Sequence, residues 1–207
     1  MTLADPPLPM SADHWAALRA AYAVPARAYH NFGHVRQVLA HYSDVAAGPG
    51  WRQPKEIWLA ALYHDAIYQP GRKDNEARSA ELAVRQIATH WPRAGIDAPR
   101  VAELILLTAR HGQLTPQDVD HDAALFLDCD MAILGADAAA FDAYDQGIAD
   151  EYAGHVPGWL FRRERRRFCA ALLEQPRIFL SDYFHQRYDA PARANLRRRL
   201  AGGDQPA

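Results

Sequence analysis

The dipeptide His64–Asp65 is the first pair of side chains in this sequence that could bind a metal ion or activate water. It ends the apolar run WLAALYHD, whose composition favours a buried helix. Adjacent residues on a helix point about 100° apart, so both side chains reach one ion only where it lies close to the helix end. A dipeptide of this kind is common by chance and needs further ligands elsewhere in the chain.

His34 and Asp130 are the candidate further ligands. His34 begins an amphipathic stretch, and Asp130 lies in the apolar segment FLDCDMAILG. A carboxylate in such a segment is rarely buried without a partner or a metal. Two imidazoles and two carboxylates suit Mn, Fe, Co, Ni or Mg better than a thiolate-seeking ion. Four ligands on a six-coordinate ion leave room for water and a substrate oxygen, as a catalytic site requires.

Each of these two candidates has a neighbour that could replace it. His30 precedes His34 in a loop, whereas His34 starts a helix whose hydrophobic face would hold it in place. We therefore favour His34 as the ligand and leave His30 to meet the substrate. Asp128 lies two residues before Asp130, so the two carboxylates diverge on a helix and only one should bind.

Apolar residues recur at helical spacing almost throughout the chain, and no strand-like alternation is sustained. The pattern predicts an all-α protein. One inward face is expected to carry Leu82, Val84 and Ile87. The expected helices cover about residues 11–22, 33–45, 54–64, 74–90, 99–111, 141–152, 157–174 and 191–200, with a further apolar segment at 125–135.

The chain shows no internal repeat and no clear linker. We expect a proline-containing irregular arm at residues 1–10, a single domain at 11–200 and a disordered tail at 201–207. The arginine-rich run RRERRR (Arg162–Arg167) is most simply a solvated helix face.

The overall composition is that of an ordinary globular protein. The chain has 207 residues, of which 49% are hydrophobic and 23% charged, and its formal net charge is -2. A net charge this small produces only a weak electrostatic field around the protein. This argues against a dedicated duplex-nucleic-acid binder or a polybasic membrane binder. No segment has the features of a signal peptide or the ~20 apolar residues of a membrane span. We expect a cytoplasmic protein that binds a small substrate. The sequence does not decide whether the protein is a monomer or a homodimer.

A set of short motifs follows one another along the chain: YHNFGH (Tyr29–His34), ALYHDAIYQP (Ala61–Pro70), KDNEARSA (Lys73–Ala80), LLTARH (Leu106–His111), FLDCDMAILG (Phe126–Gly135) and ARANL (Ala192–Leu196). Together, in this order, they resemble the HD-domain superfamily, in particular its predicted metal-dependent phosphohydrolase branch. The resemblance spans about residues 27 to 200.

The resemblance implies an HD-domain-like helical bundle around one divalent metal ion. It maps the family's ligands onto His34, His64, Asp65 and Asp130, and it favours Asp130 because the family ligand stands just before an apolar residue, here Met131. The implied activity is hydrolysis of a phosphate ester or anhydride of a nucleotide or another small phosphorylated metabolite. A second ion is not excluded, because further histidines lie between the HD pair and Asp130: His90, His111 and His121.

The same motifs suggest the other site residues. Asp65 could accept a proton from the attacking water as well as bind the ion. Glu76 could act as general base or hold a ligand histidine, although its position also suits the N-terminus of a helix. His111 could donate a proton to the leaving oxygen, bind phosphate or supply a ligand to a second ion, or it could simply bind carbonyl groups at the end of a helix. The residues expected to contact substrate are His30, Asn75 and Arg165.

Two other functions are compatible with the same residues. A non-catalytic sensor would keep the ion and bind a nucleotide without turnover. A di-iron oxygenase would use extra histidines for a second ion, so metal stoichiometry separates it from a hydrolase.

Overall fold

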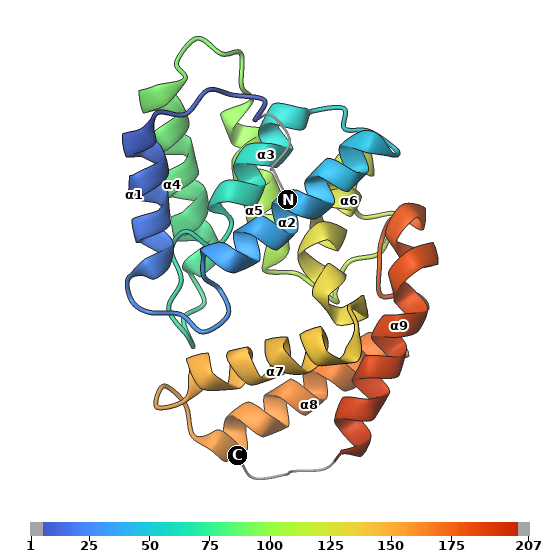
Figure 1. Ribbon diagram of the computed structural model, residues 1–207. Helices are drawn as coiled ribbons and strands as arrows, with labels where there is room; N and C mark the ends of the chain where they lie inside the picture. Colours follow the sequence, from blue (N-terminus) through green and yellow to red (C-terminus); the bar gives the residue numbers. More distant parts are fainter. Residues whose placement is uncertain (1–5, 203–207) are drawn as a thin grey trace. The chain divides into compact units, whose positions relative to one another are not determined.

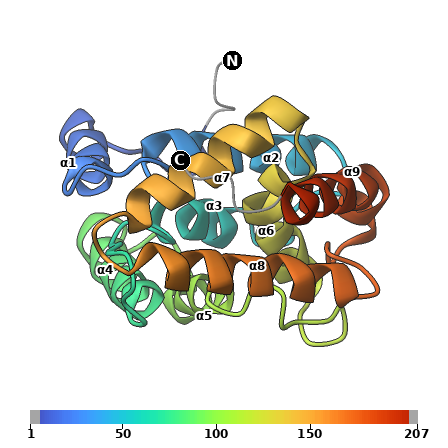
Figure 2. The ribbon, with the colours of Figure 1, turned by 90° about the horizontal axis from the view of Figure 1, so that it is seen from below.

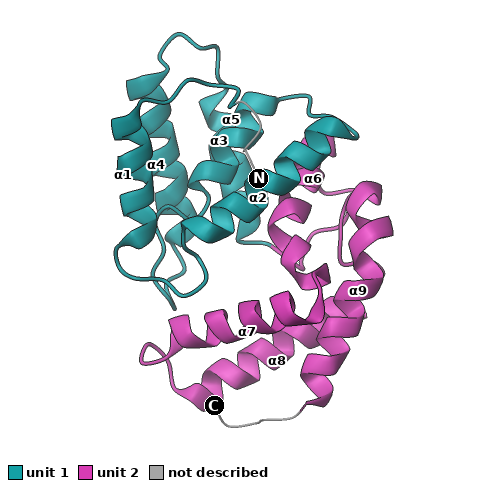
Figure 3. Cartoon of the chain, in the orientation of Figure 1, with its two compact units in different colours: residues 1–110 teal, residues 111–207 magenta. Residues whose placement is uncertain are grey.

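The computed structural model describes residues 6–202, and this part of the chain is entirely helical (Figure 1). It contains nine α-helices and one short 3-10 helix. The all-α prediction is therefore confirmed. The chain divides into two compact units, residues 1–110 and 111–207 (Figure 3), and the predicted single domain at 11–200 stays a prediction.

Unit 1 is built around a central helix that is buried on all sides. Every residue of α3 from Glu56 to Tyr63 is buried, which is typical of a helix that is apolar around its whole circumference. Its neighbours include α4 and α5, which lie side by side (Figure 2). The helices of unit 1 are α1 (Ala12–Ala23), α2 (Phe32–Ala47), α3 (Pro54–Tyr63), α4 (Asn75–His90) and α5 (Ala98–Thr108).

Local sequence features explain where helices of unit 1 begin and end. Ser11 caps α1, because its Oγ accepts a hydrogen bond from the backbone N–H of His14. Pro54 lies at the start of α3, where the missing N–H costs nothing. α3 ends at Tyr63, so the buried His64 lies directly at the end of the helix.

The described part of the predicted N-terminal arm is non-helical but packs on unit 1. Leu8 is buried, and the carbonyl of Pro9 accepts a hydrogen bond of 2.9 Å from Nε1 of Trp91. Residues 1–5 of the arm, and residues 203–207 of the predicted disordered tail, lie outside the described residues.

Unit 2 has a second almost wholly buried helix. In α6, the residues from Asp122 to Cys129 are all buried. α9 packs against the 3-10 helix, where a Cβ on Gly135 would lie 2.7 Å from the carbonyl oxygen of Tyr188, so only glycine fits. The helices of unit 2 are α6 (His121–Met131), η1 (Ala132–Gly135), α7 (Ala138–Tyr152), α8 (Gly158–Glu174) and α9 (Asp182–Ala201).

Three expectations about the helices were wrong. α9 starts at Asp182, capped by Ser181, and contains Pro191, which the sequence pattern had placed at a helix start. It also runs to Ala201, into the predicted tail. Val84 was expected to point inward but is 37% exposed, because small residues such as Ala80 and Ala83 form the buried face of α4.

Within residues 6–202, no helix combines the length and the apolar character that crossing a membrane would require.

The position of Pro191 inside α9 leads to a stability prediction. Proline removes a backbone hydrogen bond and clashes with the preceding turn, and Pro191 is exposed, so no packing compensates. Pro191→Ala should raise the free energy of unfolding by about 1 to 3 kcal/mol, part of the gain being lost to the freer unfolded chain. Urea denaturation checks this, and an unchanged or lower stability would mean that the helix begins at Pro191.

Candidate metal centre

Two buried histidines of unit 1 face each other at the centre of the candidate site. The Nε2 atoms of His34 and His64 lie 3.0 Å apart, and the two rings are inclined at 69°. His34 stands in the first turn of α2, whose N-cap Asn31 accepts a hydrogen bond from Gly33. His64 is the C-cap of α3. Helix ends therefore hold both rings, so neither nitrogen depends on a mobile loop.

Asp65 brings a carboxylate to the same point. Its Oδ2 lies 3.2 Å from Nε2 of His64 and 3.6 Å from Nε2 of His34. The three predicted ligands of unit 1, which come from two helix ends, therefore meet. We refer to His34, His64 and Asp65 as the His–His–Asp trio.

The hydrogen bonding of His64 favours metal binding. Its Nδ1 lies 3.0 Å from the carbonyl oxygen of Ala61, which can only accept, so Nδ1 carries the proton. In the neutral ring, Nε2 then has a lone pair directed at His34 and Asp65. A histidine held through its other nitrogen by a backbone carbonyl is the usual arrangement of a metal ligand. The residues present therefore fit a divalent ion.

The carboxyl group of Asp65 is held in its ionised form. Burial acts to raise its pKa, but the imidazoles of His64, His30 and His34 outweigh this and hold the pKa well below the ordinary range. A carboxylate with such a low pKa is suited to bind a metal ion. The predicted role of Asp65 as the acceptor of a water proton stays a prediction.

His30 lies beside the trio and makes different contacts. Its ring stacks on Tyr68, with centroids 4.1 Å apart, and meets the ring of His34 edge-on at 5.9 Å. The geometry thus favours His34 as the ligand and leaves His30 half-exposed at the edge, where contact with a substrate stays a prediction.

Arg27 is a positioning residue that the sequence analysis missed. Its Nη1 donates to the carbonyl oxygens of Asp65 (2.6 Å) and His30 (3.0 Å). Its Nη2 donates to those of Ala21 (2.9 Å) and Ala66 (3.2 Å). One guanidinium therefore ties α1, the loop before α2 and the turn after α3 together. The only signal in the sequence is a lone charged residue in the loop directly before YHNFGH.

Two residues of KDNEARSA fix the chain that follows the trio. Asn75 accepts from the N–H of Gln69 and donates to its carbonyl, both at 3.0 Å. Ser79 accepts from the N–H of Ile67 at 3.0 Å and donates to its carbonyl at 3.1 Å. These bonds engage the side-chain amide of Asn75 with the backbone and give it a positioning role. Its predicted contact with substrate stays a prediction.

Glu76 has an uncommitted carboxylate. It lies half-buried in the first turn of α4, and no described residue forms a hydrogen bond or ion pair with it. The neighbouring Asp74 makes no side-chain capping bond and instead binds Arg72 at 2.6 Å. The roles of Glu76 as base, as support for a ligand histidine or as helix-end charge therefore stay open to experiment.

In unit 2, His111 and Asp130 form a close pair. Nε2 of His111 lies 2.8 Å from Oδ2 of Asp130, and the two side chains are 19% and 14% exposed. A carboxylate bonded to one imidazole nitrogen fixes the orientation of the ring. The pair is thus arranged as an oriented acid or base. The membership of Asp130 in a ligand set with the trio stays a prediction.

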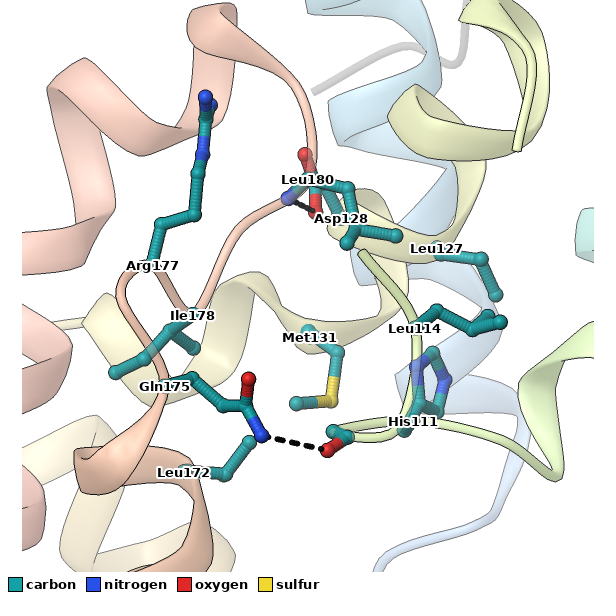
Figure 4. Close-up of a pocket in the computed structure, with 11 residues that line it drawn as sticks. His111, Leu114, Leu127, Asp128, Met131, Leu172, Gln175, Arg177, Ile178 and Leu180 are labelled. Carbon is teal, nitrogen blue, oxygen red and sulfur yellow. Dashed lines mark hydrogen bonds between the residues drawn. The ribbon is translucent and has the colours of Figure 1, made fainter. Parts of the chain in front are cut away.

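Asp128, the alternative to Asp130, has a different task. Its carboxylate accepts a hydrogen bond of 2.7 Å from the N–H of Leu180 (Figure 4). It accepts two more from Ser181, one from the N–H (2.7 Å) and one from Oγ (2.6 Å). Burial raises the pKa of Asp128 to about 7, although these bonds and the charge of Arg177 act in the opposite direction. Asp128 anchors the segment that begins α9, which leaves Asp130 as the carboxylate suited to function.

Arg165 is buried in the helices of unit 2. Its Nε lies 2.9 Å from Asp145, and its guanidinium lies 4.9 Å from the ring centroid of Tyr144. These contacts give it a packing role, and its predicted contact with substrate stays a prediction without support here. The other arginines of RRERRR are exposed, as expected for a solvated helix face: Arg162, Arg163, Arg166 and Arg167.

The further histidines considered for a second ion have other contacts. His90 stacks on His14 in unit 1, with ring centroids 3.9 Å apart. His121 lies 4.0 Å from Asp122 in unit 2. A second ion stays a prediction.

Comparison with protein-family models, with curated proteins and with solved structures gives no match for this chain.

The contrast between Asp128 and Asp130 predicts two separable phenotypes. Asp128→Ala leaves three buried donors without their acceptor and should lower the free energy of unfolding by about 3 kcal/mol or more, with metal binding retained at low temperature. Asp130→Ala should cost about 1 kcal/mol or less of stability and abolish metal retention or turnover. Urea denaturation and metal analysis measure both effects, and the reverse pattern would show that Asp128 is the ligand.

The contacts of Arg27 predict an effect on metal affinity. A lysine ammonium lacks the planar fork needed to reach four carbonyl oxygens at once. Arg27→Lys should therefore weaken binding of Mn²⁺ by about 10- to 100-fold, the usual effect of removing support from a metal ligand. Arg78→Lys, on an exposed site of α4, is the matched control. Equal dissociation constants for both variants and the wild type would exclude the positioning role.

Proposed function

We propose that this protein is a metal-dependent hydrolase of phosphate esters or anhydrides, acting on a nucleotide or another small phosphorylated metabolite. The observation that carries the proposal is the 3.0 Å approach of the His34 and His64 Nε2 atoms beside the carboxylate of Asp65. Two buried imidazole nitrogens beside a largely buried, ionised carboxylate are a donor set for a divalent cation. The resemblance to the HD-domain superfamily supplies the reaction type.

The proposed site uses the trio as ligands from unit 1 and Asp130 as the fourth ligand. Nitrogen and oxygen donors of this kind suit Mn, Fe, Co, Ni or Mg, and one ion per chain is expected. When bound, the ion supplies a Lewis acid for the phosphoryl oxygens and lowers the pKa of water toward neutrality. The depressed pKa of Asp65 favours the ionised carboxylate that a metal ligand requires.

The remaining catalytic and binding roles are proposed for side chains other than the ligands. Glu76 carries a carboxylate that no described residue engages, so it is the proposed acceptor of the water proton. His111, oriented by Asp130 at 2.8 Å, is the proposed donor of a proton to the leaving oxygen. His30 is half-exposed beside the trio and is the proposed contact to the phosphoryl group.

One specific observation also favours a second candidate, an iron-dependent oxygenase. Two histidines and one carboxylate that leave coordination positions open are the ligand set of non-haem Fe(II) oxygenases. Such an enzyme would require iron and consume O₂, whereas a hydrolase of the proposed kind works anaerobically and accepts a redox-inert ion. Oxygen uptake and metal selectivity decide between the two.

The test of the proposed function combines metal analysis with hydrolysis. Purified protein should hold about one divalent transition ion per chain and release phosphate from nucleotides or pyrophosphates. A chelator should remove both the ion and the activity. His34→Ala, His64→Ala and Asp65→Ala should each lose the ion and at least about 100-fold in rate, with helical content unchanged.

His41→Ala is the matched control, because His41 lies on α2 beside Asp44 and away from His64. It should keep both the ion and the rate. Undiminished hydrolysis by metal-free protein would contradict the proposal, as would a loss of activity in the control alone.

One further variant tests the role of Glu76. Glu76→Gln keeps the size of the side chain and removes its basicity. If Glu76 accepts the water proton, the variant should bind metal normally and lose about 100-fold or more in kcat, with KM little changed. If it only interacts with the helix dipole, stability should fall by about 0.3 to 1 kcal/mol and kcat should persist. Loss of the ion would instead indicate support of a ligand.

A further inference from the structure

One of the three buried residues of α1 is a histidine. The buried residues of this 12-residue helix are His14, Leu18 and Tyr22, and His14 is 5% exposed. An isolated helix of this length is only marginally stable in water, so α1 depends on its packing contacts. The charge of the His14 ring therefore affects a large part of what holds α1 in place.

The ring of His14 contacts the ends of α3 and α4. Its Nε2 lies 2.6 Å from the hydroxyl of Tyr63, the last residue of α3. Its face stacks on the ring of His90, the last residue of α4, with centroids 3.9 Å apart. The ring of Trp91 follows at 5.0 Å. His14 therefore joins α1 to α3 and to α4, beside which α1 lies in Figure 1.

The hydrogen bond between His14 and Tyr63 suits a neutral imidazole. Burial raises the pKa of the Tyr63 hydroxyl, so this group keeps its proton. The hydroxyl donates that proton to Nε2 of His14 when the ring is neutral and Nε2 has a lone pair. A proton on Nε2 would leave the buried hydroxyl donor without this acceptor, and such a loss costs stability.

The surroundings of His14 are unfavourable to an imidazolium. The titratable groups in contact with the ring are the hydroxyl of Tyr63 and the imidazole of His90. Asp13 is exposed, and among the described residues no carboxylate forms an ion pair with His14. Burial and, to a smaller extent, the charge of His90 lower the pKa of His14. The docked position of α1 therefore favours the neutral ring.

α1 also contacts the start of α2, where one ligand of the trio stands. Phe32 is the first residue of α2, two positions before His34. Trp15 meets the ring of Phe32 edge-on, with centroids 6.4 Å apart, and Tyr22 lies at 5.9 Å. The guanidinium of Arg19 lies 5.6 Å from the centroid of the same ring. These contacts support the first turn of α2.

The end of α3 is bonded to α1 directly before the other two ligands of the trio. The hydroxyl of Tyr22 donates to the carbonyl oxygen of Leu62 at 2.9 Å, and the ring of His14 binds Tyr63. His64 is the next residue. α1 thus contacts both of the helix ends that hold the trio, and it supports them only while it is docked.

We propose that α1 is an acid-released clamp on the two helix ends that carry the His–His–Asp trio, and that protonation of His14 releases it. The consequence for the metal centre rests on the proposed function, whereas the release of α1 does not. On release, the pKa of His14 returns from its lowered value toward the ordinary 6.5. The clamp is therefore fully stable above that pH and weakens as the pH falls below it.

Hydrogen–deuterium exchange of the full chain measures the release of α1. After correction for the intrinsic pH dependence of exchange, the opening constant of residues 12–23 should rise below pH 6.5, by up to about tenfold per pH unit. His14→Gln retains a hydrogen-bond acceptor for Tyr63 but cannot be protonated. Its opening constant should not rise in acid, whatever its value at neutral pH.

Two further variants make the comparison independent of any destabilisation by His14→Gln. His90→Asn, at an exposed site, removes the neighbouring imidazole and should make the rise smaller. His155→Gln, which changes an exposed histidine in the turn after α7, is the matched control and should show the full rise. An absent rise in the wild type, or an equal rise in the wild type and in His14→Gln, would overturn the proposal.

Binding of Mn²⁺ separates the clamp from the proposed function. Metal ligands lose affinity in acid in every variant, so the pH dependence is compared between variants. Between about pH 7.5 and about pH 5.5, the Mn²⁺ dissociation constant should increase less in His14→Gln than in the wild type, by up to about tenfold. An equal increase would overturn the link between α1 and the metal centre. A rise in opening that depends on His14, in a protein that binds no Mn²⁺ at any pH, would refute the proposed function and retain the acid release of α1.

Discussion

The approach of two imidazole nitrogens to 3.0 Å is the constraint around which the functional part of unit 1 is arranged. Both rings are almost completely buried, and the carboxylate of Asp65 lies within 3.6 Å of both Nε2 atoms. Burial of three such polar groups is costly unless they bind each other or a cation. The Nδ1 proton of His64 is committed to the carbonyl of Ala61, so its remaining nitrogen is directed at the shared point.

The supporting residues act through the backbone. Arg27 donates to four carbonyl oxygens, two of them in the turn that contains Asp65, while Asn75 and Ser79 bind the backbone of Gln69 and Ile67. Each of these side chains forms its bonds with peptide groups, so its effect is to fix where the chain turns after α3. The site is therefore held by a network of loop-to-helix bonds, and α3 provides the rigid, buried base.

The sequence predicted most helices because their patterns are local. Val101, Leu104, Ile105 and Thr108 recur at helical spacing and are all buried in α5, and Ser11 caps α1 as its residue type suggests. The start of α9 was not predictable from Pro191, because proline is common at helix starts and here lies inside the helix. The inward face of α4 was not predictable from Val84, because small residues with a weak hydrophobic signal form the buried face of this helix.

The candidate site was predictable only in part. His34, His64 and Asp65 could be grouped from motifs, and the structure brings them together. Arg27 could not be found, because its contacts depend on three segments meeting in space and leave no spacing in the sequence. The task of Asp128 was hidden for the same reason: its partners Leu180 and Ser181 lie far along the chain. Long-range bonds between a side chain and the backbone have no local pattern.

The most direct measurement of the central claim is anomalous diffraction from crystals grown with Mn²⁺. The account predicts one strong anomalous peak within about 2.0 to 2.3 Å of Nε2 of His34, Nε2 of His64 and a carboxylate oxygen of Asp65. A peak elsewhere, or no peak at these three residues at saturating Mn²⁺, would contradict the assignment of this cluster as a metal centre.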